Sequence, residues 1–137
     1  MTKRIKVLSW AVRIVAAVIL LQTLYFKFGG AEESIYIFSK LGVEPAGRYA
    51  SGIMELIASI LLLWPRTVWL GAILGLGIMA GAIAAHLTIL GVVVMDDGGY
   101  LFGLGVLVFV CCAAALAIHW QQLPLIHRNS RSISPRA

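Results

Sequence analysis

Lys27, Glu55 and His86 lie within or at the edge of long apolar stretches, where a charged group is costly. An ammonium, a carboxylate and an imidazole can pair with one another, bind a polar small molecule or relay protons. Ser51, Glu55 and Ser59 recur at intervals of four residues, so on a helix they form a narrow polar stripe. We expect that stripe to face the interior of a helix bundle and not lipid.

The depths of these residues along their apolar stretches predict a shared polar cluster, with Lys27, Glu55 and His86 as candidate ligand-binding residues. Arg13 shares a helix face with Lys27 but lies about 21 Å from it at 1.5 Å per residue, so it is a second candidate partner for Glu55. Gln22 points to the opposite side of that helix. The mouth of the candidate pocket is expected to contain Arg48, Tyr49 and Tyr100.

Spacing alone leaves three roles open for this cluster: tying helices together, binding a ligand or serving redox chemistry, and passing protons or ions. No metal site is predicted, because no pair of histidines stands at ligand spacing on one helix. Cys111 and Cys112 are neighbours that would point about 100° apart on a helix, which favours small apolar packing and leaves a thiol role open. His119 and His127 are expected at the membrane interface.

The composition places these residues in a membrane protein. The chain has 137 residues, of which 61% are hydrophobic and 12% charged, and its mean hydropathy is +0.94. Soluble domains are about a quarter charged, so this chain cannot cover a water-exposed surface. The net charge of +5 is spread over short segments between apolar stretches, which argues against nucleic-acid binding.

Four apolar stretches predict an all-α fold, an integral membrane four-helix bundle in one transmembrane domain spanning residues 1–137. The expected spans are 7–26, 48–64, 67–90 and 100–120, with an outer loop at 27–47 and a cytoplasmic tail at 121–137. Ile35, Phe38 and Leu41 at helical spacing predict a short interfacial helix in the outer loop, the alternative being a solvated loop. Gly71 and Gly75 predict close helix packing.

Charge and aromatic patterns predict that both termini are cytoplasmic (N-in/C-in), in a multi-pass protein of the bacterial inner membrane. Basic residues favour one side: Lys3, Arg4, Lys6, Arg66, Arg128, Arg131 and Arg136, against Lys27, Lys40 and Arg48. All the tryptophans mark inner ends, and tyrosines mark the outer side. A cleaved signal peptide is disfavoured, because the first apolar stretch is long and contains Arg13.

Several segments together resemble the DoxX and DoxX-like family of small four-helix bacterial membrane proteins, over about residues 7 to 120. They are Arg13, Tyr25-Phe26-Lys27-Phe28, Gly52-Ile53-Met54-Glu55-Leu56 with Leu61-Leu62-Leu63-Trp64-Pro65, and the segment from Ile78 to His86. The resemblance implies polar family positions at Arg13, Lys27, Glu55 and His86. It also implies an accessory role beside thiosulfate:quinone oxidoreductases or proteins that handle sulfur and oxidative stress.

Together with this resemblance, the sequence predicts a non-catalytic membrane subunit with a small polar pocket in the outer half of the bundle, and the resemblance implies that the subunit is redox-associated. His86 and Lys27 would donate hydrogen bonds to a ligand carbonyl, and Glu55 would orient them. No catalytic residue is assigned. The cofactor is unknown, with a bound quinone possible. The expected partners are the lipid bilayer, an oxidoreductase and a second copy of the chain. A small transporter or proton pathway protein and a structural or assembly protein without a ligand stay open as alternatives.

Overall fold

The computed structural model describes residues 1–122, and every regular element in that range is helical. The helices are α1 (Lys3–Gly29), α2 (Glu32–Lys40), α3 (Ala46–Leu63), α4 (Val68–Ala85) and α5 (Tyr100–Ile118). A π-helical segment, η1 (His86–Leu90), extends α4, and a short 3-10 helix, η2 (Trp120–Gln122), follows α5. Residues 123–137, with His127 and most of the predicted tail, lie outside the described residues.

Four of these helices are long and apolar enough to cross a membrane. They are α1, α3, α4 together with η1, and α5. Each closes its backbone hydrogen bonds internally, which is the requirement for a segment that crosses lipid. The predicted fold class, an all-α membrane bundle of four helices, is confirmed.

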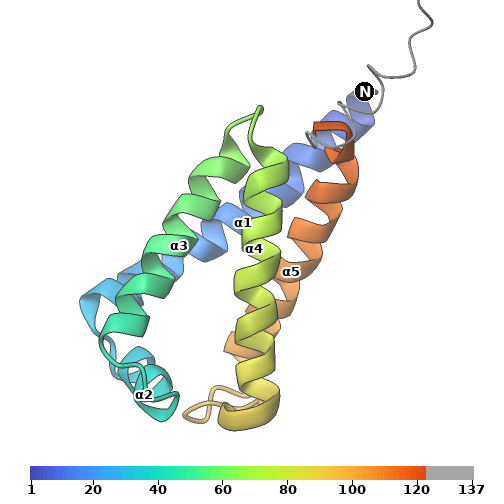
Figure 1. The fold of residues 1–137 in the computed structure, drawn as a ribbon. Coiled ribbons are helices and arrows are strands. Elements are labelled where there is room, and N and C mark those ends of the chain that lie inside the picture. The colour runs from blue at the N-terminus through green and yellow to red at the C-terminus, as the bar shows by residue number, and fades with distance from the viewer. Residues whose placement is uncertain (123–137) are drawn as a thin grey trace, which may run out of the picture.

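The four long helices pack as a ring, in which α1 and α4 each contact both α3 and α5 (Figure 1). The N-terminus and the end of α5 lie at one end of the ring, which we call the terminal end. The short helix α2 and the turn after η1 lie at the other end, which we call the α2 end (Figure 1). A helix in the first long loop, as predicted, is therefore present.

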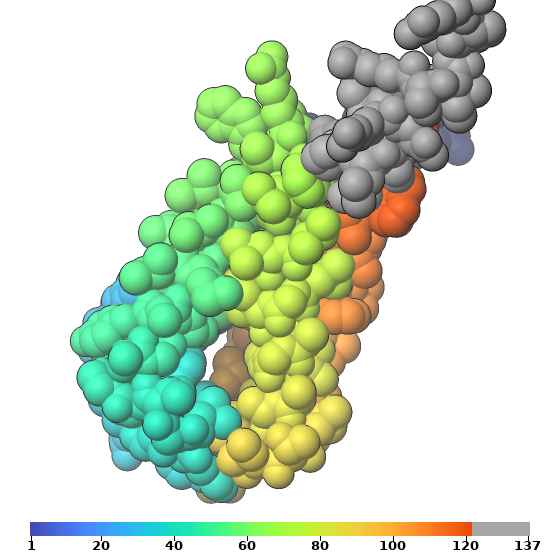
Figure 2. Space-filling model, viewed as in Figure 1, coloured from blue at the N-terminus to red at the C-terminus, as the bar shows by residue number. Residues whose placement is uncertain are grey.

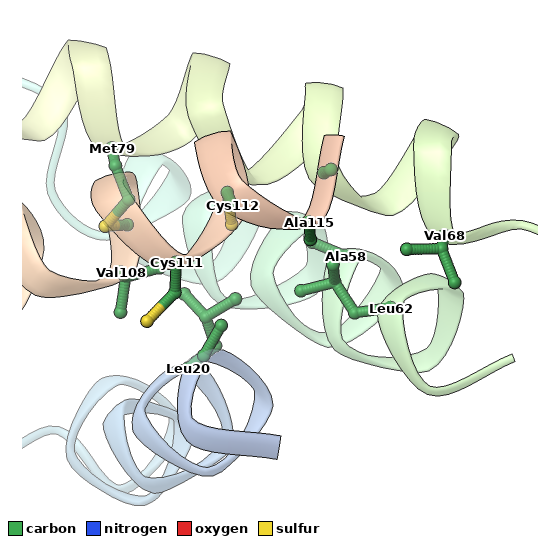
Figure 3. Close-up of a cluster of buried hydrophobic side chains, with 11 residues drawn as sticks. Leu20, Ala58, Leu62, Val68, Met79, Val108, Cys111, Cys112 and Ala115 are labelled. Carbon is green, nitrogen blue, oxygen red and sulfur yellow. The ribbon is translucent and has the colours of Figure 1, made fainter. Parts of the chain in front are cut away.

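Small and branched apolar side chains fill the centre of the bundle. The buried residues in Figure 3 include Leu20, Ala58, Leu62, Val68, Met79, Val108, Cys111, Cys112 and Ala115. Both cysteines are free thiols packed in this core. Their surroundings match the apolar packing expected from the sequence.

Two glycines allow α4 to approach its neighbours closely. A Cβ atom on Gly71 would lie 2.6 Å from the backbone nitrogen of Leu62, and one on Gly75 would lie 2.6 Å from the Cys112 sulfur. Both distances are shorter than carbon contacts allow. The Leu62 backbone cannot move aside, so only glycine fits at position 71, whereas a Cβ at position 75 would require the Cys112 side chain to shift. Close packing of α4 against α3 and α5 therefore depends on these two positions.

Candidate functional site

An ion pair joins α1 to α3 near the α2 end. Lys27, in the last turn of α1, places its Nζ 2.5 Å from Oε1 of Glu55. Glu55 lies in the middle of α3 and is only 2% exposed. A buried carboxylate without a cation would be strongly destabilising, so the ammonium lowers the cost of keeping Glu55 in the bundle.

Two hydroxyl groups complete the hydrogen bonding of this pair. Lys27 Nζ also donates to Oγ of Ser51 at 3.0 Å, one turn before Glu55 on the same face of α3. The Thr23 hydroxyl lies 2.8 Å from Glu55 Oε2 and 2.7 Å from the backbone oxygen of Leu20, with one proton to share between them. Both oxygens of the carboxylate are thus engaged. We call Thr23, Lys27, Ser51 and Glu55 the polar cluster.

His86 comes from the other side of the ring, where α4 widens into η1. Its Nδ1 lies 2.9 Å from the backbone oxygen of Gly91. The Phe102 ring of α5 meets the imidazole edge-on, with 5.6 Å between ring centres. Within residues 1–122, no hydrogen bond joins His86 to Lys27 or Glu55.

A cavity of about 480 Å³ separates His86 from the polar cluster, and both line its wall. Most of the remaining wall is apolar and includes Leu20, Phe38, Met79, Phe102, Leu104 and Val108. Figure 2 shows the molecule hollowed in this region, between the α2 end of α3 and the yellow end of α4. A largely apolar chamber with a few polar groups has the size and character of a small-molecule site.

Of the three residues predicted at the mouth, Tyr100 lines the cavity and Arg48 and Tyr49 do not. Arg48 Nε donates to Glu44 Oε1 at 2.8 Å, and Arg48 Nη1 donates to the backbone oxygen of Lys27. The guanidinium lies 4.6 Å from the centre of the Tyr49 ring. Arg48 therefore fastens the start of α3 to the end of α1, a contact that the sequence could not reveal.

Arg13 does not approach Glu55 and belongs to the terminal end. Its Nε donates to the backbone oxygen of Leu62 at 2.6 Å, and its guanidinium lies 3.9 Å from the centre of the Trp10 ring. Because α1 and α3 cross the bundle in opposite directions, the first half of α1 meets the last turn of α3. The carboxyl end of a helix attracts a cation, so Arg13 caps α3.

His119, the residue that follows α5, is buried at the terminal end of the bundle. Its Nε2 lies 2.6 Å from Oγ of Ser9, so the residue after α5 is joined to the first part of α1. Burial, and to a smaller extent the charge of Arg13, lower the pKa of His119 below its ordinary value. The terminal end thus contains a second polar group, which is separate from the cavity.

Asp97 organises the turn that leads into α5. Its Oδ1 accepts hydrogen bonds from the backbone N–H of Val94 and Gly99, and its Oδ2 accepts one from Leu101. Desolvation raises the pKa of Asp97, but these three N–H groups outweigh it and lower the pKa overall. Asp97 therefore stabilises the start of α5.

Two residues of α1 on the cavity wall were missed or misplaced by sequence reasoning. Thr23 contacts Glu55, and Gln22 lines the cavity although it was expected to face away from the site. A signal for Thr23 was available, because it precedes Lys27 by one helical turn and shares its face. Gln22 could not be placed without knowing how far α1 is rotated against its neighbours.

Four apolar helices around a largely apolar chamber with a few polar groups define a small multi-pass membrane protein. The chain belongs to the DoxX family, whose profile matches residues 8–94. The matched region includes Lys27, Glu55 and His86 and ends before α5. No curated protein and no solved structure matches the chain.

Proposed function

We propose that this DoxX-family protein is a non-catalytic membrane subunit that binds a small, largely apolar molecule in the cavity near the α2 end. Lys27 would donate a hydrogen bond to the polar part of that molecule. Glu55 would hold Lys27 in position, and Thr23 and Ser51 would fix the pair. The apolar wall would enclose the rest of the ligand.

The observation that carries this proposal is the position of the polar cluster in the wall of a mostly apolar cavity. A cluster that only tied helices together would not need a chamber beside it. Cavities in well-packed proteins are few, and packing is lost where they occur. The space next to Lys27 and Glu55 is therefore best explained by an occupant.

The redox association rests on the family resemblance, with a quinone as the leading ligand. A quinone has a carbonyl that can accept a hydrogen bond from Lys27, and its ring is suited to the apolar wall. The protein would work beside an oxidoreductase in the bacterial inner membrane, with both termini in the cytoplasm. The electrons would then come from the partner and not from groups of this chain.

Quinone binding to the protein in lipid nanodiscs tests this proposal. A short-chain quinone should bind the wild type, and Glu55→Gln should weaken binding about 10-fold or more, because a charged hydrogen-bond partner of Lys27 is lost. Glu32→Gln is the matched control, since Glu32 is exposed on α2 and does not line the cavity. Equal affinity in the wild type and Glu55→Gln would contradict the proposal.

The same variants separate the other interpretations. A purely structural cluster predicts that Glu55→Gln lowers thermal stability while no bound molecule is found in the wild type. A transport role predicts substrate-dependent or proton-dependent flux into liposomes that Glu55→Gln abolishes. Crosslinking in native membranes tests the partner, and failure to recover any oxidoreductase would count against the redox association.

A further inference from the structure

We infer that the ligand of the cavity is an uncharged molecule with two separate polar groups: a hydroxyl that donates to His86 Nε2 and an oxygen that accepts from Lys27 Nζ. This inference rests on the proposed ligand-binding function and specifies the chemistry of the ligand. A quinone has carbonyls but no hydroxyl, so of a quinone and its reduced quinol only the quinol has the required donor. It follows from the hydrogen bonds that His86 and Lys27 already make within the described residues.

The contact between His86 and Gly91 fixes which ring nitrogen carries the proton. A backbone carbonyl can only accept, so Nδ1, at 2.9 Å from the Gly91 oxygen, must be the donor. In the neutral imidazole the other nitrogen, Nε2, then carries a lone pair. Gly91 is not part of the cavity wall, and Nε2 makes no hydrogen bond within residues 1–122. The sequence predicted a donor at His86, whereas this tautomer presents an acceptor.

Lys27 has the opposite character. Its ammonium has three N–H donors, of which one is directed to Glu55 and one to Ser51. The third has no acceptor within the described part of the chain. Lys27 lines the cavity, with the Phe38 ring centre 5.7 Å from its Nζ. One side of the cavity therefore offers a donor, and the side formed by η1 offers an acceptor.

The charge of the wall excludes an anion. The wall contains the carboxylates of Glu33 and Glu55 and the single ammonium of Lys27, so with a neutral His86 it carries one net negative charge. This net negative charge would repel an anion. The rest of the wall is apolar, which favours an uncharged ligand over a hydrated cation.

Three related probes test the two hydrogen bonds. The first is a para-hydroxyphenyl alkyl ketone, which has both polar groups. The second is the para-fluorophenyl ketone, which has similar size but no hydroxyl donor, and the third is the para-alkylphenol, which lacks the carbonyl. Affinities are measured by equilibrium dialysis against the protein in nanodiscs, with empty nanodiscs as the blank.

The hydroxy ketone should bind most tightly to the wild type. Loss of the hydroxyl should weaken binding about 3- to 10-fold, the value of one neutral hydrogen bond. Loss of the carbonyl should weaken binding about 10-fold or more, because its donor, Lys27, is charged. In His86→Ala the hydroxy and fluoro ketones should bind equally. In Thr88→Ala the hydroxy ketone should still bind more tightly than the fluoro ketone. Thr88 lies in the same segment as His86, but it is exposed and donates only to the backbone oxygen of Ala84.

The outcomes distinguish this inference from the function on which it rests. Equal binding of the hydroxy and fluoro ketones to the wild type would overturn the inference and leave a ligand cavity in place. A hydroxyl preference that survived in His86→Ala would also overturn it. If neither these probes nor the short-chain quinone bound to the folded protein, the ligand-binding function itself would fail, whereas binding of the quinone alone would overturn only the inference. The comparison of ketones in the wild type needs no variant, so it stands even if His86→Ala does not fold.

Discussion

At the scale of single residues, the polar cluster depends on a hydrogen-bond donor for each carboxylate oxygen of Glu55. Lys27 gives Glu55 one strong donor, and the remaining carboxylate oxygen depends on the Thr23 hydroxyl. Within the described residues, Thr23 is the only side chain that serves this oxygen. A buried acceptor without a partner loses its hydration without compensation, so Thr23 contributes more than an average hydroxyl.

Thr23→Val should therefore destabilise the protein by about 1–3 kcal/mol, because it keeps the side-chain shape but leaves Glu55 Oε2 without its donor. Thr23→Ser should retain most of the stability. Thr88→Val is the matched control and should change stability by about 0.5 kcal/mol or less, since the Thr88 hydroxyl is exposed. Unfolding in detergent, followed by circular dichroism, measures these differences. Equal losses for Thr23→Val and Thr88→Val would show that Thr23 has no special role.

At the scale of helices, α4 supports the site through its small residues. One part of α4 packs tightly on α3 and α5, where Gly71 and Gly75 leave no room for a methyl group. Nearer the α2 end, Gly81 and Ala82 instead line the cavity. The same kind of residue thus produces close packing at one depth and space for a ligand at another.

Gly71→Ala and Gly77→Ala should have opposite effects. A methyl group at Gly71 would lie 2.6 Å from the backbone nitrogen of Leu62, and the backbone cannot move aside to relieve this clash. We therefore expect Gly71→Ala to lower the free energy of unfolding by about 1–3 kcal/mol. Gly77 has no atom within 4 Å of the added Cβ, and alanine there should be neutral or stabilise α4 by up to about 1 kcal/mol. Thermal unfolding of the two variants decides the matter, and a similar change in both would contradict this account of the α3–α4 contact.

At the scale of the whole molecule, the ring is closed by contacts between the two ends of the described chain. Ser9 and His119 meet in a buried hydrogen bond, and Arg13 lies in the same region. These residues are far apart in sequence, so their contact forms only when α1 and α5 are packed. The terminal end is therefore a sensitive reporter of whether the bundle is assembled.

This closure should make stability depend on pH. The folded-state pKa of His119 lies below 6.5, so the unfolded chain binds the proton more readily. The stabilisation is complete above pH 6.5 and is lost as the pH falls through the folded-state value. His119→Gln should remove this part of the dependence, with melting temperatures from about pH 8 to 5 as the measurement. An identical pH profile in the wild type and His119→Gln would rule out this contribution.

The orientation of the bundle is also a property of the whole molecule. The terminal end contains Lys3, Arg4, Lys6 and Arg66, and from these charges the positive-inside rule predicts a cytoplasmic position for this end. A fluorescent protein fused after Gln122 should therefore be fluorescent, and alkaline phosphatase fused there should be inactive. A phosphatase inserted at Gly42, at the α2 end, should be active. The reverse pattern would invert the predicted topology.

The amino-acid sequence by itself determined the membrane class, the number of long helices and the stripe that carries Ser51 and Glu55. These properties depend on composition and on a period of 3.6 residues, both of which are local. Only the tertiary structure decided that Lys27 and not Arg13 reaches Glu55, that His86 turns its Nδ1 to Gly91, and that His119 meets Ser9. Such contacts depend on the rotation and order of helices around the ring, and side chains at the same depth can face different neighbours.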